Sequence, residues 1–329
     1  FFVLLLVLIN FLLKKNEILN HKIDNYEHKK IGEKNIPLSG GLYFILPVLF
    51  FLYFYEFDFR YLIFFILFLI LGMVIDSGYE INPKLRLLLH LIIISSFVVF
   101  NDFTIIKTGI LIFDQALKTE FFSVIFTIFC LVVFLNGLNF IDGVNCNSIG
   151  FSLMVTSTIL LIHLNILNLS FASTLFTVIV SSIIVFYIFN LFNKNFLGES
   201  GNYVLGFFLG IIIIHVININ DEINPLLAVS LLWYPSFENL FSIIRKGYFE
   251  KKSAFEPDSS HLHTLIYKFL KKKNYKRANS YAGVVINLFL VPNFLISYFF
   301  YYHTKILSMN ILIYLIIYIT SYIILNKKL

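Results

Sequence analysis

Long apolar runs recur along all 329 residues of this chain. A helix needs about 20 apolar residues to cross a bilayer core of about 30 Å, and eleven runs approach that length, some of them with flanking aromatic residues. They are 1–13, 41–55, 59–75, 85–101, 120–136, 149–167, 171–189, 203–219, 225–243, 281–302 and 307–325. The sequence therefore predicts an all-α polytopic integral membrane protein, with about eleven transmembrane helices in a single domain, 1–329.

The basic residues divide unevenly between the two sides of such a bundle. When the connections alternate, all but Arg60, Lys107, Lys118 and Lys305 of the 25 Lys and Arg residues fall on one side. By the positive-inside rule that side is cytoplasmic. The net charge of +6 then reflects topology. Because no nucleic-acid-binding motif accompanies it, we expect the lipid bilayer and no nucleic acid as a partner.

The two cysteines and three of the histidines are expected to have structural roles. Cys130 and Cys146 are the two cysteines, so the sequence supports neither a disulfide framework nor a cysteine zinc site. His90, His163 and His215 lie in or near apolar runs, where we expect histidines that serve packing.

Four polar stretches interrupt the apolar sequence, each after a predicted helix. They are 76–86, 136–145, 196–202 and 257–263. Counting the helices places all four on the cytoplasmic side. Ionisable groups gathered at one membrane face tend to mark function. We therefore predict a metal-assisted active site built from cytoplasmic loops.

The first stretch offers groups for a cation and a phosphate. Asp76 can contact a divalent cation or act as a base, and Lys84 and Arg86 can hold an anionic phosphate. An ordinary solvated turn at Asn82-Pro83 explains this stretch equally well when it is taken alone.

The second stretch repeats polar residues every three positions, which places them as neighbours on a helical turn. The residues are Asn136, Asn139, Asp142 and Asn145. Oxygen ligands of this kind suit Mg²⁺ or Mn²⁺. The alternative is a capped helix end.

The third and fourth stretches add phosphate and proton-transfer candidates. Gly198 and Gly201 flank the start of a new helix, whose amides attract phosphate, and Glu199 between them can bind a metal. His261 and His263 lack the i, i+4 spacing of a helical zinc pair. They fit better as hydrogen-bond donors or proton carriers for phosphates.

The order and spacing of these stretches resemble the polyprenyl-phosphate N-acetylhexosamine-1-phosphate transferases, glycosyltransferase family 4 enzymes of the WecA/TagO/MraY type. The resemblance begins at 36–41, Ile-Pro-Leu-Ser-Gly-Gly, which is similar to the family's Pro-Arg-x-Gly-Gly motif, and ends at the His-Leu-His of 261–263. The region 238–263 is most similar to the WecA-like branch. The loop 245–280 carries the His-Leu-His motif.

The resemblance implies the reaction, the partners and the location. A HexNAc-1-phosphate would pass from UDP-N-acetylhexosamine to undecaprenyl phosphate, with release of UMP, to initiate cell-surface polysaccharide synthesis of the O-antigen or teichoic acid kind. Mg²⁺ is the implied cofactor, with Mn²⁺ as the alternative. The protein would lie in a bacterial cytoplasmic membrane, and the sequence is compatible with a homodimer.

The resemblance also assigns roles by position. Catalytic roles fall to Asp76, Asp142, His261 and His263, metal binding to Asn139 and Glu199, and substrate binding to Arg86 and to Asn145, which matches a contact to uracil. Lys84, Gly198 and Gly201 are added as substrate-binding candidates from their residue chemistry alone.

Three positions depart from the family pattern. Ser77 stands in place of a second Asp, Glu199 in place of an Asp, and Leu38 in place of an Arg. These changes motivate an alternative, a noncatalytic descendant that binds lipid phosphate in a glycan assembly complex. A transporter is disfavoured, because its ionisable residues would lie at the bilayer midplane.

Overall fold

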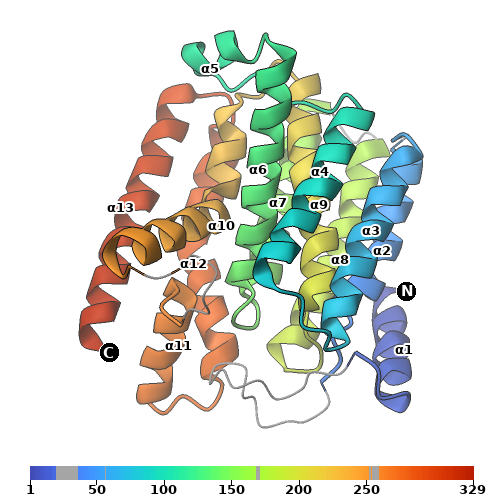
Figure 1. The fold of residues 1–329 in the computed structure, drawn as a ribbon, viewed down its shortest axis with the longest axis vertical. Helices are drawn as coiled ribbons and strands as arrows, with labels where there is room; N and C mark the ends of the chain where they lie inside the picture. Colours follow the sequence, from blue (N-terminus) through green and yellow to red (C-terminus); the bar gives the residue numbers. More distant parts are fainter. Residues whose placement is uncertain (20–35, 56, 168–170, 252, 254–258) are drawn as a thin grey trace.

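The computed structural model describes residues 1–19, 36–55, 57–167, 171–251, 253 and 259–329. Regular secondary structure in these residues is helical throughout, with thirteen α-helices and one π-helix, η1 (Figure 1). The helices are α1 Phe2–Lys15, α2 Gly40–Phe54, α3 Arg60–Asp76, α4 Pro83–Phe100, α5 Leu111–Ala116, α6 Glu120–Ile141, α7 Asn147–Leu167, α8 Phe171–Leu191, α9 Gly198–Ile219, α10 Leu226–Ile244, η1 Arg245–Phe249, α11 Leu262–Lys272, α12 Ala278–Phe299 and α13 Thr304–Lys328.

Every predicted apolar run coincides with a helix, which confirms a multi-pass membrane protein. Eight helices of the described chain are long and apolar enough to cross a bilayer, and α2 is a shorter apolar helix. Of the eleven expected spans, eight are therefore confirmed on length and composition among the described residues, and the helices at the other three, α1, α2 and α3, are shorter. Two helices, α5 and α11, were not predicted as spans and lie at opposite ends of the bundle (Figure 1).

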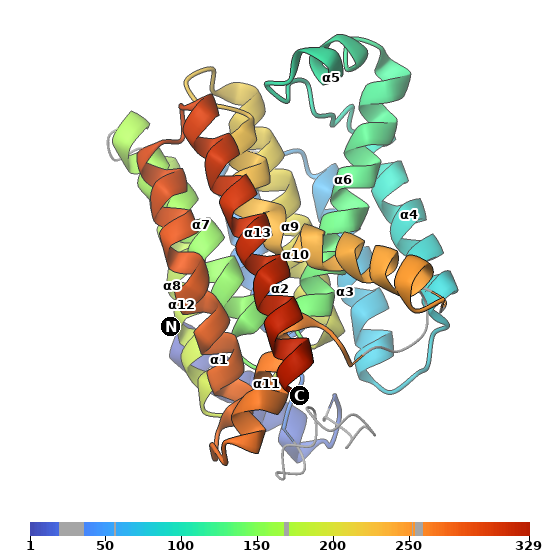
Figure 2. The ribbon, with the colours of Figure 1, turned by 90° about the vertical axis from the view of Figure 1, so that its left-hand side faces the viewer.

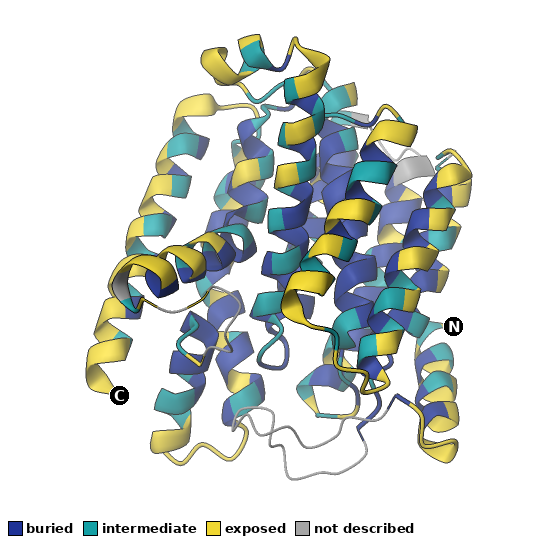
Figure 3. Cartoon of the chain, viewed as in Figure 1, coloured by how far each residue is buried: buried dark blue, intermediate teal, exposed yellow. Residues whose placement is uncertain are grey.

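Helix α9 forms the centre of the bundle. It packs against α2, α3 and α6, and 83% of the residues in its apolar segment are buried. Figure 3 shows buried residues concentrated on the inner helices and exposed residues on the outward faces. Because lipid tails are as apolar as these side chains, close van der Waals packing is what holds such helices together. The site at the start of α9 is therefore built on the most enclosed helix.

Small residues bring α2 and α3 against the first turn of α9. A Cβ added at Gly72 would lie 2.2 Å from the Cα of Ser200, and one at Gly40 would lie 2.2 Å from the carbonyl oxygen of Leu197. Only glycine permits such an approach of two backbones. The end of α3 and the start of α9 are thereby fixed relative to each other.

Helix α10 changes direction at Pro235. A proline inside a helix removes one backbone hydrogen bond and bends the helix, and Figures 1 and 2 show the second half of α10 running across the bundle axis. A Cβ at Gly137 of α6 would lie 2.2 Å from the Pro235 carbonyl oxygen, so α6 packs closely on the bend. The bend directs the end of α10 toward the polar end of the bundle.

Candidate active site

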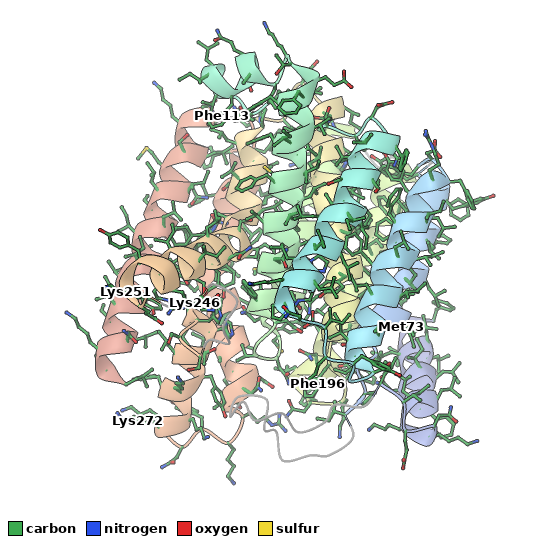
Figure 4. All side chains as sticks on the ribbon, in the orientation of Figure 1. Met73, Phe113, Phe196, Lys246, Lys251 and Lys272 are labelled. Atoms are coloured by element: carbon green, nitrogen blue, oxygen red, sulfur yellow. The ribbon has the colours of Figure 1, made fainter. Side chains whose placement is uncertain are left out.

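All four polar stretches meet at one end of the bundle, opposite α5. Hydrogen bonds join the end of α3 and the end of α6 to the first turns of α9, and His263 lies against Gly143. Figure 4 shows Met73 near this end of α3 and Phe196 just before α9, with Phe113 of α5 at the far end. The prediction that the stretches gather is confirmed. Two residues of the fourth stretch, Pro257 and Asp258, lie outside the described residues.

Asp76 caps the start of α9. Its Oδ1 accepts the backbone N–H of Glu199 at 2.8 Å, and its Oδ2 accepts the N–H and the hydroxyl of Ser200 at 3.1 and 2.6 Å. A carboxylate at a helix N-terminus satisfies amides that lack a partner in the helix and interacts favourably with the helix dipole. The amides expected to attract phosphate are thus occupied by a side chain of the same protein.

The glycines of this turn make that contact sterically possible. Gly198 has φ +73°, and a Cβ there would lie 2.7 Å from Oδ2 of Asp76. Gly201 packs against α2, since its Cβ would lie 2.9 Å from the Cα of Gly40. In this structure both glycines therefore allow other parts of the protein to pack closely against this turn.

Glu199 lies beside the cap and carries an unpartnered oxygen. Its Oε1 is 3.3 Å from Nη1 of Arg86, and both side chains are partly exposed. Its Oε2 is buried and has no hydrogen-bond partner among the described residues. Lys84 is exposed at the first turn of α4, where its N–H donates to Asn82 Oδ1.

The polar cluster extends inward to two buried residues. His90 lies one turn after Arg86 on α4, and its ring centroid is 4.6 Å from that of Tyr203. Neither the Tyr203 hydroxyl nor the His90 ring nitrogens have a hydrogen-bond partner among the described residues. His90 was expected to serve packing, and its position beneath Arg86 and Glu199 makes it part of the site's surroundings.

The residues of the second stretch divide into two groups. Asp142 ends α6 and accepts Nδ2 of Asn202 at 2.8 Å, while Asn139, one turn earlier, is partly exposed. Asn145 is buried, and its Nδ2 donates to the backbone oxygen of Asn190, to Asn193 Oδ1 and to Ser280. Asn145 therefore ties α8 to α12, and Asp142 faces the site. Asn136 lies within α6 and donates to the Val132 backbone oxygen at 2.8 Å.

The two histidines of the fourth stretch stack on each other. Their ring centroids are 5.4 Å apart and the planes differ by 7°. His263 is buried, and a Cβ at Gly143 would lie 2.1 Å from its Nε2, so Gly143 makes room for this ring. His261 lies with Nδ1 at 2.9 Å from Oε1 of Glu238 in α10.

Sequence reasoning did not assign a role to Glu238. Its side chain is 1% exposed, although it belongs to a membrane-spanning helix. A carboxylate inside the predicted span 225–243 was the available signal, because such groups are costly in a bilayer and usually have a function.

The donor set suits a cation that retains water and phosphate ligands. Among the described residues, no three His, Cys, Asp or Glu side chains gather at ligand distance, so an all-protein cage is not formed there. Mg²⁺ is usually held by one or two carboxylates together with substrate phosphates. The unpartnered Oε2 of Glu199 fits that arrangement, with Asp142 and Asn139 as further oxygen donors on α6.

Comparison with known proteins agrees with this geometry. Residues 59–217 match the family Glycosyl transferase family 4. This matched region, just under half of the chain, is similar to that family. The matched region includes Asp76, Asp142 and Glu199 and ends before α10. The predicted family is thus confirmed.

A curated relative of this chain is the probable undecaprenyl-phosphate N-acetylglucosaminyl 1-phosphate transferase of Bacillus subtilis (strain 168). The two are 26% identical over 216 residues, which covers 59% of this chain and 54% of the relative. The chain therefore spans about half the length of the curated relative that it matches.

Proposed function

We propose that this protein transfers a HexNAc-1-phosphate from a UDP-sugar to undecaprenyl phosphate in a bacterial cytoplasmic membrane, as a first step of surface polysaccharide synthesis. The observation that carries the proposal is that the family match covers Asp76, Asp142 and Glu199, which the fold brings to one end of the bundle. The relative of 26% identity, named for the same class of reaction, supports it.

In the proposed reaction an oxygen of the lipid phosphate attacks the β-phosphorus of the UDP-sugar. The bond from that phosphorus to the bridging oxygen breaks, and UMP leaves with the bridging oxygen. Negative charge accumulates on the diphosphate, so cationic groups at this place lower the barrier. Mg²⁺ or Mn²⁺ held by Glu199 and Asn139 would supply that neutralisation when bound.

The cations and histidines of the site contact phosphate groups in this proposal. Arg86 is partly exposed beside Glu199, and Lys84 is exposed two residues earlier, so both can hold the phosphate of the lipid. His263 lies against Gly143 and His261 stacks on His263, and in this proposal both rings donate to the diphosphate. Asn145 can contact uracil through its carboxamide oxygen, because its nitrogen is committed to other partners.

The two aspartates divide the remaining roles. Both oxygens of Asp76 accept hydrogen bonds from the start of α9, so Asp76 positions Glu199. Asp142 is only partly buried and is oriented by Asn202. Asp142 is therefore the better candidate to orient the lipid phosphate and to accept its proton when the phosphate arrives as a monoanion.

The test is UMP release by purified protein with undecaprenyl phosphate, a panel of UDP-HexNAc donors, and Mg²⁺ present or chelated. We expect metal-dependent release that Asp142→Asn lowers at least about 100-fold. The matched control is Asp58→Asn, which removes an exposed carboxylate outside the site and should leave release unchanged. Wild-type protein that is folded but releases no UMP from any donor would overturn the proposal.

One observation favours a second candidate, a noncatalytic protein that binds lipid phosphate in a glycan assembly complex. Ser77 supplies no second carboxylate, and its hydroxyl donates back to the Met73 backbone oxygen at 2.7 Å. That candidate predicts lipid phosphate binding without exchange of label between UMP and the UDP-sugar. Ser77→Asp would then be the variant in which exchange should appear.

A further inference from the structure

A buried acid lies behind the histidine pair. Glu238 sits three residues after the bend at Pro235, in a membrane-spanning helix, and its side chain is 1% exposed. A buried carboxylate is stable only when donors satisfy its oxygens. The hydrogen-bond donors around Glu238 therefore indicate which ring nitrogen of His261 carries a hydrogen.

Three groups converge on the two oxygens of Glu238. The hydroxyl of Tyr318, from α13, donates to Oε2 at 2.5 Å, and the backbone N–H of Leu262 approaches Oε1 at 3.4 Å. Nδ1 of His261 is the third group, at 2.9 Å from Oε1. Two donors, an O–H and an N–H, therefore already point at this carboxyl group, and the arrangement suits Nδ1 of His261 as a third donor.

We propose that Glu238 is a positioning residue that fixes the tautomer and the plane of the His261 ring. With Nδ1–H bound to Glu238, the second ring nitrogen, Nε2, acts as an acceptor when the ring is neutral and as a donor when the ring is protonated. Two aromatic rings fix the orientation of the His261 ring. The centroid of His263, which stacks on it, is 5.4 Å away, and the centroid of Phe140 is 5.7 Å away. The proposal rests on the proposed function for the identity of the substrate.

The contact also couples three elements of the fold. Glu238 belongs to α10, Tyr318 to α13, and His261 precedes α11. Two contacts hold the histidine pair in place: Glu238 contacts His261, and Gly143 contacts His263. An acid on a packed helix orients a loop residue more firmly than loop contacts do.

The first experiment reads the tautomer directly. We would record nitrogen chemical shifts of the whole protein, labelled with ¹⁵N-histidine, at about pH 9, where histidine side chains are neutral. His261→Gln assigns the resonances. Wild type should show His261 protonated on Nδ1, and Glu238→Gln should convert part or all of it to the form protonated on Nε2.

Controls separate this effect from a general disturbance. Glu250 lies twelve residues after Glu238 and pairs with Arg245. Glu250→Gln removes that carboxylate and should leave the His261 signals unchanged. Tyr318→Phe removes the donor to Oε2 and should also keep the Nδ1 proton in place. An Nε2-protonated His261 in wild type, or an unchanged tautomer in folded Glu238→Gln protein, overturns the proposal.

Kinetics provides the second readout. Loss of the carboxylate partner of a functional histidine commonly costs about 10-fold to 100-fold. We expect Glu238→Gln to lower kcat in that range with KM for the UDP-sugar changed less, and Glu238→Asp to recover part of kcat because it keeps the charge. An unchanged kcat in Glu238→Gln overturns the inference. Absence of UMP release in wild type would instead overturn the proposed function, whereas the tautomer measurement needs no activity.

Discussion

The two ends of the bundle use charged residues in different ways. At the site end, where α3 and α6 end and α9 begins, Asp76 contacts residues 123 and 124 positions later in the sequence, and it is 9% exposed. At the α5 end, Asp58 pairs with Arg60 two positions away, and both side chains are exposed. The difference indicates that a buried carboxylate with several partners characterises the site end, while exposed acids with a single basic partner characterise the α5 end.

Two exposed acids at the α5 end each have one basic partner that affects their ionisation. A hydrogen bond from the Arg60 side chain lowers the pKa of Asp58, and one from Lys107 lowers the pKa of Asp221. Such exposed pairs contribute little to stability because water and salt screen them. Removing one of them should therefore matter much less than removing a site-end acid.

Gly198→Ala should give the largest effect. Alanine at φ +73° is strained by about 1–2 kcal/mol, and its Cβ would additionally overlap Oδ2 of Asp76. Gly109→Ala is the matched control, since Gly109 has φ +76° at the α5 end and nothing closer than 3.6 Å to an added Cβ. Thermal unfolding in detergent should show a clearly larger loss for Gly198→Ala. Equal losses would mean that contact with Asp76 adds no constraint.

Asp76→Asn should cost about 1–3 kcal/mol of unfolding free energy. One carboxamide oxygen cannot replace two carboxylate oxygens that accept three hydrogen bonds. Asp221→Asn, which removes an exposed acid at the other end, should shift the unfolding midpoint only slightly at pH 7. A similar small change in both variants would contradict the capping role.

Glu199→Gln should change the metal requirement more than stability. The substitution keeps the shape but removes the charge of the buried, unpartnered oxygen, so the Mg²⁺ concentration for half-maximal UMP release should rise about 10-fold or more. Glu120→Gln, exposed at the start of α6 near the α5 end, is the control. An unchanged Mg²⁺ dependence would remove Glu199 from the metal site.

The smallest effect concerns pH. Because the pKa of Asp221 is lowered in the folded protein, its pairing stabilises the protein above the ordinary aspartate pKa of about 3.9. That contribution disappears as pH falls through the lowered value. Wild type and Asp221→Asn should therefore have unfolding midpoints that differ slightly at pH 7 in low salt and coincide well below pH 3.9. A difference that grows at acid pH would reverse the assignment.

Local patterns in the sequence predicted a large part of this protein. Apolar runs identified the membrane helices, because helix length in a bilayer is a local property. Alternating the helices then placed the four polar stretches together, and the family resemblance singled out Asp142 and Glu199. The short helices α5 and α11 were not predicted as spans, since neither is long enough to cross a membrane.

The tertiary structure decided which of the polar residues lie open at the site and which hold the protein together. Asp76 became a cap on α9, Asn145 a tie between α8 and α12, and Glu238 the partner of His261. Each of these contacts depends on where helices far apart in sequence come to lie, through close glycine packing and the bend at Pro235. No local pattern encodes such a meeting, because the packing of the whole bundle determines it.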